Sequence, residues 1–272
     1  MEISLSNSAT SREKISIPTV TPPAPRSWKG SQWVWRGRRR DEERVSESSV
    51  VSKLSEREVG VLEYINYFGR VDAEFLRNIF FKDGTIAGAK VRLRRVLKSL
   101  KEKQLVVESV WLRGRKVYAL KNSAKLKKCL KLLQIEYQGP RSFTHSQMDH
   151  DLLVCRAFEL WMEKLGQKLP FFATERMLKR SNFHFEGSLP DLVFSSDPEL
   201  KRHYIVEIET SLKSVFRYER KILDFYESNR CLNLVFYCLN SNIKKRISRA
   251  SKVIAQDQNW LKIRSMEVLN EK

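Results

Sequence analysis

The run His203-Tyr204-Ile205-Val206-Glu207-Ile208-Glu209 is the stretch on which the fold of this chain depends. It is short and apolar until two glutamates close it, which is the pattern of a half-buried or buried β-strand. Because alternate side chains of a strand share a face, Glu207 and Glu209 are expected on one face, with Ile208 in the core between them. The sequence therefore predicts two neighbouring carboxylates at the end of a strand.

Helical and strand-like segments alternate on both sides of this run. The apolar pattern predicts three helices, at 143–165, 211–228 and 241–254, and four further strands, at 170–174, 189–194, 231–239 and 261–268. A helix, three strands, a helix and a strand form an α/β sandwich with a right-handed crossover from the third strand to the fourth. We therefore predict an αβββαβ domain at 143–272.

The first half of the chain predicts an α+β arrangement of a different kind. Ser55 and Asp72 are placed to cap two helices, and a third helix is predicted at 86–103. Two strand-like pieces follow, at 105–112 and 116–120, joined by a basic turn. Three short helices and a basic hairpin are the winged-helix arrangement, so we expect a winged-helix DNA-binding domain at 51–122.

The predicted third helix is amphipathic. Its apolar face is formed by Val91, Leu93, Val96, Leu97 and Leu100. Its basic face fits the major groove of DNA, and the wing that follows reaches an adjacent phosphate. The side chains expected to contact DNA are Lys90, Arg92, Arg94, Arg95, Lys98, Arg113, Arg115 and Lys116. The alternative is a winged helix used for protein contacts.

Composition favours a nucleic-acid partner and a cytoplasmic location. The 272 residues include 51 Lys and Arg against 32 Asp and Glu, and the formal net charge of +19 attracts polyanions. A merely soluble basic protein, or one that binds acidic membranes, is the alternative. No apolar run approaches the roughly 18 residues of a membrane span. The four cysteines form no metal or disulfide pattern, which fits a reducing cytosol.

Two segments lie outside the predicted domains. Residues 1–50 are expected to form a disordered basic arm, and 123–142 a basic linker helix. Within the arm, residues 28–40 interleave tryptophan with arginine and lysine. This run either meets phosphates and stacks on bases, or forms a solvated tail whose tryptophans dock on the folded body.

A metal site is predicted where the strands meet. Pro190-Asp191 begins the strand before the opening run, so Asp191 is expected beside Glu207 and Glu209. Three carboxylates at one sheet edge repel each other unless a hard cation such as Mg²⁺ or Mn²⁺ joins them. Water bound to such a cation is acidified and can attack a phosphodiester. The alternative is a set of ordinary strand-end acids exposed at the surface.

These residues resemble the motifs of the PD-(D/E)XK nuclease superfamily. The resemblance is carried by Pro190-Asp191 and Glu207-Ile208-Glu209 in the predicted order of elements, and it implies a restriction-endonuclease-like domain. Glu209 stands where the superfamily usually has a lysine, as in a minority of restriction endonucleases, which leaves the identity of the general base open. Lys213 is a candidate for the missing cation.

Over residues 55 to 240 the chain is also similar to the MobC-type plasmid relaxases and the related replication-relaxation proteins. After the winged helix, the similarity is carried by His150-Asp151, Glu175, Pro190-Asp191, Val206 to Ser214, and Arg217-Tyr218 with Lys221 and Tyr226. It implies nicking at an origin of transfer, with Asp191, Glu207 and Glu209 as metal ligands. The implied partners are double-stranded DNA, the nicked single strand, and accessory or coupling proteins of a relaxosome.

Three further positions have two readings each. His150 orients a substrate phosphate or a water, or it is a histidine on a helix surface. Glu175 completes the metal shell, or it is a solvated carboxylate. Tyr226 is the nucleophile of a covalent mechanism, or it packs in the core.

The sequence thus predicts a metal-dependent DNA endonuclease of the nickase or relaxase kind. The main alternative is a non-catalytic winged-helix regulator or replication accessory protein whose nuclease fold has decayed, and it is motivated by the missing motif lysine. An RNA-directed nuclease is a third class.

Overall fold

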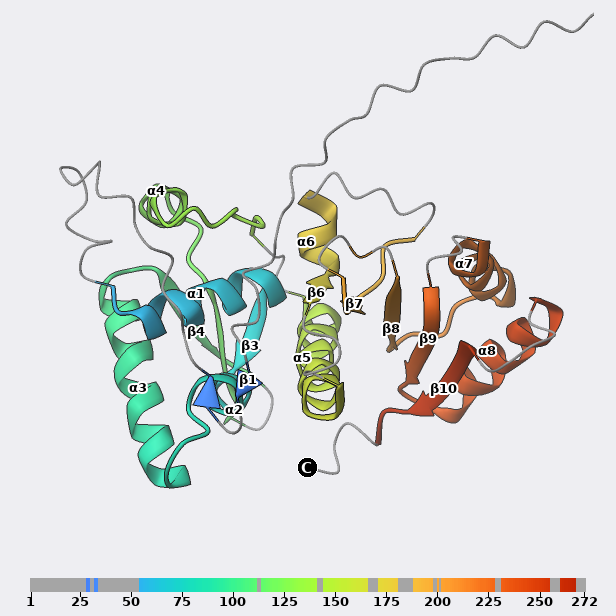
Figure 1. The fold of residues 1–272 in the computed structure, drawn as a ribbon, viewed down its shortest axis with the longest axis horizontal. Helices are drawn as coiled ribbons and strands as arrows, with labels where there is room; N and C mark the ends of the chain where they lie inside the picture. The colour runs from blue at the N-terminus through green and yellow to red at the C-terminus, as the bar shows by residue number, and fades with distance from the viewer. Residues whose placement is uncertain are drawn as a thin grey trace, which may run out of the picture.

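The computed structural model describes residues 28–29, 32–33, 54–111, 114–140, 144–165, 171–180, 188–197, 200, 202–227, 231–254 and 260–267. It shows a mixed α+β protein with one sheet of three strands and one of five (Figure 1). The described residues of the predicted arm form the strand pair β1 (Trp28–Lys29) and β2 (Gln32–Trp33). None of the helices in the described ranges is both long enough and apolar enough to cross a bilayer.

The three-stranded sheet belongs to the first half of the chain, on the left of Figure 1. Its spatial order is β3-β5-β4, and both strand pairs are antiparallel. The elements of this half are α1 (Glu56–Phe68), β3 (Arg70–Asp72), α2 (Ala73–Phe80), α3 (Ile86–Glu102), β4 (Val106–Val110), β5 (Lys116–Leu120) and α4 (Ala124–Leu132). The predicted helices and hairpin are confirmed, except that the linker helix predicted at 123–142 ends at Leu132. Strand β3 was not predicted, because three residues are too few to show an alternating pattern.

Local capping explains where these helices begin. The Ser55 hydroxyl accepts from the backbone N–H of Glu58, whose carboxylate accepts from the Ser55 N–H at 2.7 Å. Asp72 caps α2 by accepting from the Phe75 N–H at 2.8 Å.

Helix α3 presents a narrower apolar face than the sequence predicts. Leu93, Leu97 and Leu100 are buried, but Val91 is 46% exposed, so its place on the apolar face was wrong. Val91 lies two residues from Leu93, which is about 200° around the helix.

The five-stranded sheet belongs to the second half. Its spatial order is β10-β9-β8-β7-β6, with β6/β7 and β7/β8 antiparallel and β8/β9 and β9/β10 parallel. The elements are α5 (His145–Leu165), β6 (Phe171–Thr174), α6 (Glu175–Arg180), β7 (Leu192–Ser195), β8 (His203–Glu209), α7 (Val215–Glu227), β9 (Cys231–Cys238), α8 (Ser241–Ile254) and β10 (Leu261–Ser265). This is the predicted order of elements with one addition, the short helix α6.

Helices cover both faces of this sheet. Val206 and Ile208 of β8 join the apolar cluster that contains α5, whereas Ile205 joins the cluster that contains α7 and α8. Glu207 and Glu209 therefore lie on the Ile205 face, under α7 and α8. In Figure 1, α5 lies between the two sheets, and α7 and α8 lie beyond the five-stranded sheet.

Helix α5 also joins the two halves of the chain. The ring of Phe158 lies 5.0 Å from that of Phe68 in α1 and 4.7 Å from that of Phe172 in β6, between centroids. One buried apolar cluster includes all three residues. The halves thus share a core across α5.

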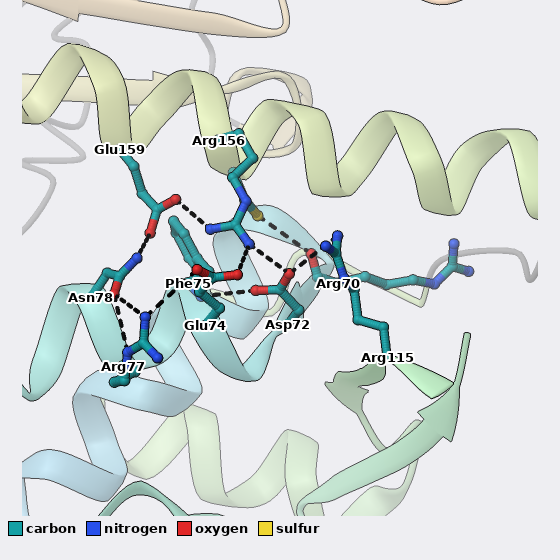
Figure 2. Close-up of polar contacts among 10 residues, drawn as sticks. Arg70, Asp72, Glu74, Phe75, Arg77, Asn78, Arg115, Arg156 and Glu159 are labelled. Carbon is teal, nitrogen blue, oxygen red and sulfur yellow. Dashed lines mark hydrogen bonds and ion pairs between the residues drawn. The ribbon is translucent and has the colours of Figure 1, made fainter. Parts of the chain in front are cut away.

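An ionic cluster reinforces this junction. The Arg156 guanidinium of α5 lies 3.0 Å from the Asp72 carboxylate and 2.8 Å from that of Glu74, and it also pairs with Glu159 (Figure 2). Because the Arg156 side chain is only 16% exposed, these charge-assisted bonds are stronger than surface pairs. They attach the beginning of α2 directly to α5.

Candidate functional site

The two glutamates of β8 lie side by side and are buried. Glu207 and Glu209 are each 1% exposed, so the alternative of ordinary exposed strand-end acids is wrong for this pair. The Lys221 ammonium of α7 reaches both, at 2.6 Å from Glu207 and 3.7 Å from Glu209. The two glutamates therefore share a face of the strand, as predicted. Two carboxylates held this close in a low-dielectric setting need a compensating cation.

Lys221 supplies that cation. Burial raises the pKa of Glu207 well above its usual range, and the neighbouring Asp191 and Glu209 carboxylates raise it further, while Lys221 opposes them. Burial by itself would lower the pKa of Lys221, but the same three carboxylates outweigh burial and raise it. Lys221 is therefore held as an ammonium ion within the acidic cluster.

Asp191 completes the predicted trio. It directly precedes β7, and its Oδ2 accepts from the backbone N–H of Ile208, the residue between the two glutamates, at 2.7 Å. Its Oδ1 lies 3.2 Å from Nε2 of His150 on α5. Burial would raise the pKa of Asp191, but the charge and hydrogen bond of His150 lower it below its ordinary value. The antiparallel register of β7 and β8 thus brings Asp191 to the pair, as the sequence predicts.

His150 lies between two carboxylates. Its Nδ1 is 3.9 Å from Asp151, and its Nε2 faces Asp191. Burial would lower the pKa of His150, but the two aspartates raise it to about 10. The imidazole is therefore charged at neutral pH, and the alternative of a plain surface histidine is wrong, since its side chain is only 19% exposed.

A buried arginine from the other half of the chain supports His150. Arg70 of β3 is fully buried, and its Nη1 lies 3.7 Å from the Asp151 carboxylate, which is itself 1% exposed. Figure 2 shows Arg70 beside Asp72 and Arg115 at the junction of β3 with the hairpin strand β5. Arg70, Asp151, His150 and Asp191 therefore form a series of alternating charges that connects the three-stranded sheet with the acidic cluster.

The remaining predicted site residues lie around this centre. Lys213 pairs with Glu209 at 2.7 Å, so it does reach the cluster from the loop before α7. Glu175 begins α6, and its backbone N–H donates to the Asp191 carbonyl, but its carboxylate pairs with Lys179 at 2.5 Å. Tyr226 lies near the far end of α7 against Trp260 and is 53% exposed, so the core-packing alternative for it is wrong.

The donor set suits a hard divalent cation in its chemistry. Asp191, Glu207 and Glu209 offer carboxylate oxygens, and Glu207 Oε1 is buried without a hydrogen-bond partner. Within the described part of the chain, no three carboxylate, imidazole or thiol side chains already form a metal-binding group. Instead, Lys213 pairs with Glu209, Lys221 with both glutamates, and His150 with Asp191. A metal would have to compete with these three cations.

A cavity of about 320 Å³ opens beside the cluster. It is lined by Glu175, Lys179, Ser188, Leu189, Lys213, Arg217, Tyr218 and Lys221. The hydroxyl of Tyr218 accepts from the Lys213 N–H at 3.3 Å and donates to the Ser211 carbonyl at 3.2 Å, which fixes the loop that carries Lys213.

The residues predicted to contact DNA are mostly exposed. Lys90, Arg94 and Arg95 project from α3, and Lys98 pairs with Glu102 at 3.8 Å. Arg92 is half-buried and donates to the Asp83 carbonyl. Near the hairpin, Arg115 lies 3.6 Å from Asp72 and Lys116 lies 2.7 Å from Glu108, and Arg113 falls outside the described residues.

Sequence reasoning missed Lys221 and Arg70 as members of the site. Lys221 has a readable signal, because it lies within the apolar stripe formed by Tyr218, Ile222 and Phe225 of α7. A lysine in such a stripe points toward the sheet and needs a carboxylate partner there. Arg70 has no such signal, since its partner Asp151 lies 81 positions further along the chain.

Comparison of the chain with models of known families, with curated proteins and with solved structures finds no match.

Proposed function

We propose that this protein binds DNA and cleaves its phosphodiester backbone at the cluster of Asp191, Glu207 and Glu209. The observation that carries the proposal is the burial of Glu207 and Glu209 beside Asp191 and a lysine, in a chain of net charge +19. Buried acids with strongly shifted pKa values beside a cavity are typical of catalytic sites. Such an arrangement is costly for a structural core, because the desolvation of buried charges can exceed their Coulombic gain.

The order of elements supports this assignment. Apart from the short helix α6 between β6 and β7, the order α5, β6, β7, β8, α7 and β9 is that of a restriction-endonuclease-like domain, and we assign Asp191 and Glu207 to the positions of the motif acids. Glu209 takes the position of the motif lysine. Lys221 then provides the ammonium from α7, where it contacts both glutamates.

A winged helix is the proposed DNA reader. Helices α1, α2 and α3 with the β4–β5 hairpin have the order of that motif, and α3 presents exposed cations. Contacts from α3 and the hairpin to phosphates would dominate the affinity and make it depend on salt.

The proposed cofactor is Mg²⁺ or Mn²⁺, held by Asp191, Glu207 and Glu209. When bound, it would acidify a water and stabilise the leaving oxygen. The protein's own side chains would orient the carboxylates, donate a proton and neutralise developing charge. Charged His150 holds Asp191 in place and offers a proton to a phosphate oxygen, while Lys221, released from Glu207, neutralises charge that develops on the phosphate.

The narrower form of the proposal is a plasmid relaxase that nicks one strand at an origin of transfer. The test compares nicking of supercoiled plasmids with and without the neighbouring origin DNA, each with Mg²⁺ and with chelator. Wild type should nick only with Mg²⁺ and origin DNA. Glu207→Gln should bind DNA as wild type does but leave the plasmid closed, whereas the exposed Glu227→Gln serves as a matched control. If Glu207→Gln nicks at the wild-type rate, the cluster is not the catalytic site.

A non-catalytic DNA-binding regulator is the second candidate. It is favoured by the pairing of each carboxylate with a cation of the chain and by the lack of a ready-made metal group in the described residues. Calorimetric titration with Mg²⁺ separates the two candidates. Binding that disappears in Glu207→Gln supports the enzyme, and no binding in wild type supports the regulator.

A further inference from the structure

The cavity beside the acidic cluster carries an excess of positive charge. Among its lining residues, Lys179, Lys213, Arg217 and Lys221 are cationic, and Glu175 is the acidic one. Three of these cations are matched inside the protein, because Lys179 pairs with Glu175, Lys213 with Glu209, and Lys221 with Glu207. Each of the three lysines is therefore paired with a glutamate, and Arg217 accounts for the excess positive charge of the lining.

Arg217 differs from its neighbours. Its backbone N–H donates to the Ser214 hydroxyl at 3.3 Å, but among the described residues its guanidinium makes no ion pair or hydrogen bond. It lies in the first turn of α7, a helix of 13 residues, where the unsatisfied N–H groups add further positive potential. A planar guanidinium that is free at the edge of a cavity is suited to bind a phosphate through two parallel hydrogen bonds.

We propose that this cavity is a phosphate-binding subsite, with Arg217 as its main ligand, and that it receives a phosphate of a nucleic-acid strand next to the bond that the carboxylates act on. The volume of about 320 Å³ is at the small end of the range for ligand sites, about 300–1,000 Å³, so it admits one nucleotide-sized group rather than a duplex. Leu189 lines it beside the cations and offers apolar surface to a sugar or a base.

Lys213 and Lys221 join the subsite to the acidic cluster. Both line the cavity, and both contact the glutamates of β8. A phosphate in the cavity would compete for their ammonium groups and release the carboxylates. The identity of the ligand as nucleic acid rests on the proposed function, but the binding of phosphate does not.

Site-specific arginine modification tests phosphate binding directly. The full-length, metal-free protein is treated with phenylglyoxal over a range of inorganic phosphate, and modification is followed peptide by peptide by mass spectrometry. Phosphate should slow the modification of Arg217 several-fold and leave that of Arg220 unchanged, since Arg220 is exposed on the same helix but does not line the cavity. Equal protection of both arginines would overturn the proposal.

Calorimetry with variants gives a second, independent measurement. Arg217→Met should weaken phosphate binding about tenfold, the usual effect of losing a charge-assisted pair of hydrogen bonds. Arg220→Met should stay within twofold of wild type. If Arg217→Met binds phosphate with the affinity of wild type, the subsite proposal is wrong even if the protein nicks DNA. If the protein binds phosphate tightly but does not nick DNA, only the proposed function is wrong.

Short single-stranded oligonucleotides distinguish the source of the phosphate. Oligothymidylates with a 5′-phosphate or a 5′-hydroxyl are used in place of inorganic phosphate. Protection of Arg217 by both indicates an internal phosphodiester, and protection by the phosphorylated strand alone indicates a strand end. If neither protects Arg217, the subsite does not receive a nucleic-acid strand.

Discussion

Removal of the Lys221 side chain should cost much of the stability of the fold. Its side chain is 14% exposed and is the ion-pair partner of buried Glu207, so Lys221→Met leaves Glu207 uncompensated, whereas Glu209 keeps its pair with Lys213. Breaking a buried pair from one side costs about 3–5 kcal/mol. We expect a loss of this size in urea unfolding, and partial recovery in the double variant Glu207→Gln, Lys221→Met. Lys179→Met, which breaks an exposed pair, should change stability by less than about 1 kcal/mol. Equal losses in the two single variants would contradict this account.

His150 should make stability depend on pH in the alkaline range. Its pKa is raised in the folded state from 6.5 to about 10, so its contribution is full below 6.5 and is lost as pH rises toward 10. Asp191 has a lowered pKa and stays ionised throughout this window. Urea unfolding in metal-free buffer should therefore show a loss of stability from pH 6.5 to 10 that is absent in His150→Gln. Parallel pH profiles for the two proteins would mean that His150 is not charged in the fold.

At the scale of elements, α3 is the predicted DNA contact. Arg94 and Arg95 are exposed and make no ion pair that the described residues provide, so both are free to meet phosphates. Replacing both with glutamine should weaken DNA binding and reduce the slope of log affinity against log salt by about 2, close to 0.9 for each lost contact. Fluorescence anisotropy at several salt concentrations measures this slope. Replacing Lys125 and Lys128 of α4 with glutamine is the matched control, and an equal effect there would point to non-specific charge alone.

The sequence predicts elements best where a local signal marks them. Ser55 and Asp72 gave the beginnings of α1 and α2 because capping is decided within four residues. Strand β3 and helix α6 were missed because both are short and depend on partners far along the chain. Strand β3, for example, pairs with β5, where Val71 lies opposite Tyr118. In the same way, strand periodicity placed Glu207 beside Glu209, whereas the Arg70–Asp151 pair depends on how the two halves pack.

At the scale of the whole molecule, we expect both halves to unfold together. Phe158 contacts rings of α1 and β6 within one cluster, and truncating a buried phenylalanine costs about 3–5 kcal/mol. Phe158→Ala should therefore reduce hydrogen-exchange protection equally in α1 and in β8. The measurement is hydrogen exchange followed by mass spectrometry. Loss of protection in only one half would show two independent folding units.

The Arg156 contacts to Asp72 and Glu74 have a consequence for the proposed cleavage of DNA. They attach the beginning of α2 to α5, which also carries His150, so the proposed reader and the proposed cutting centre cannot drift apart. On the proposed function, the polypeptide would set the number of base pairs between the recognised sequence and the cleaved bond, and DNA with altered spacing would have to bend to be cut.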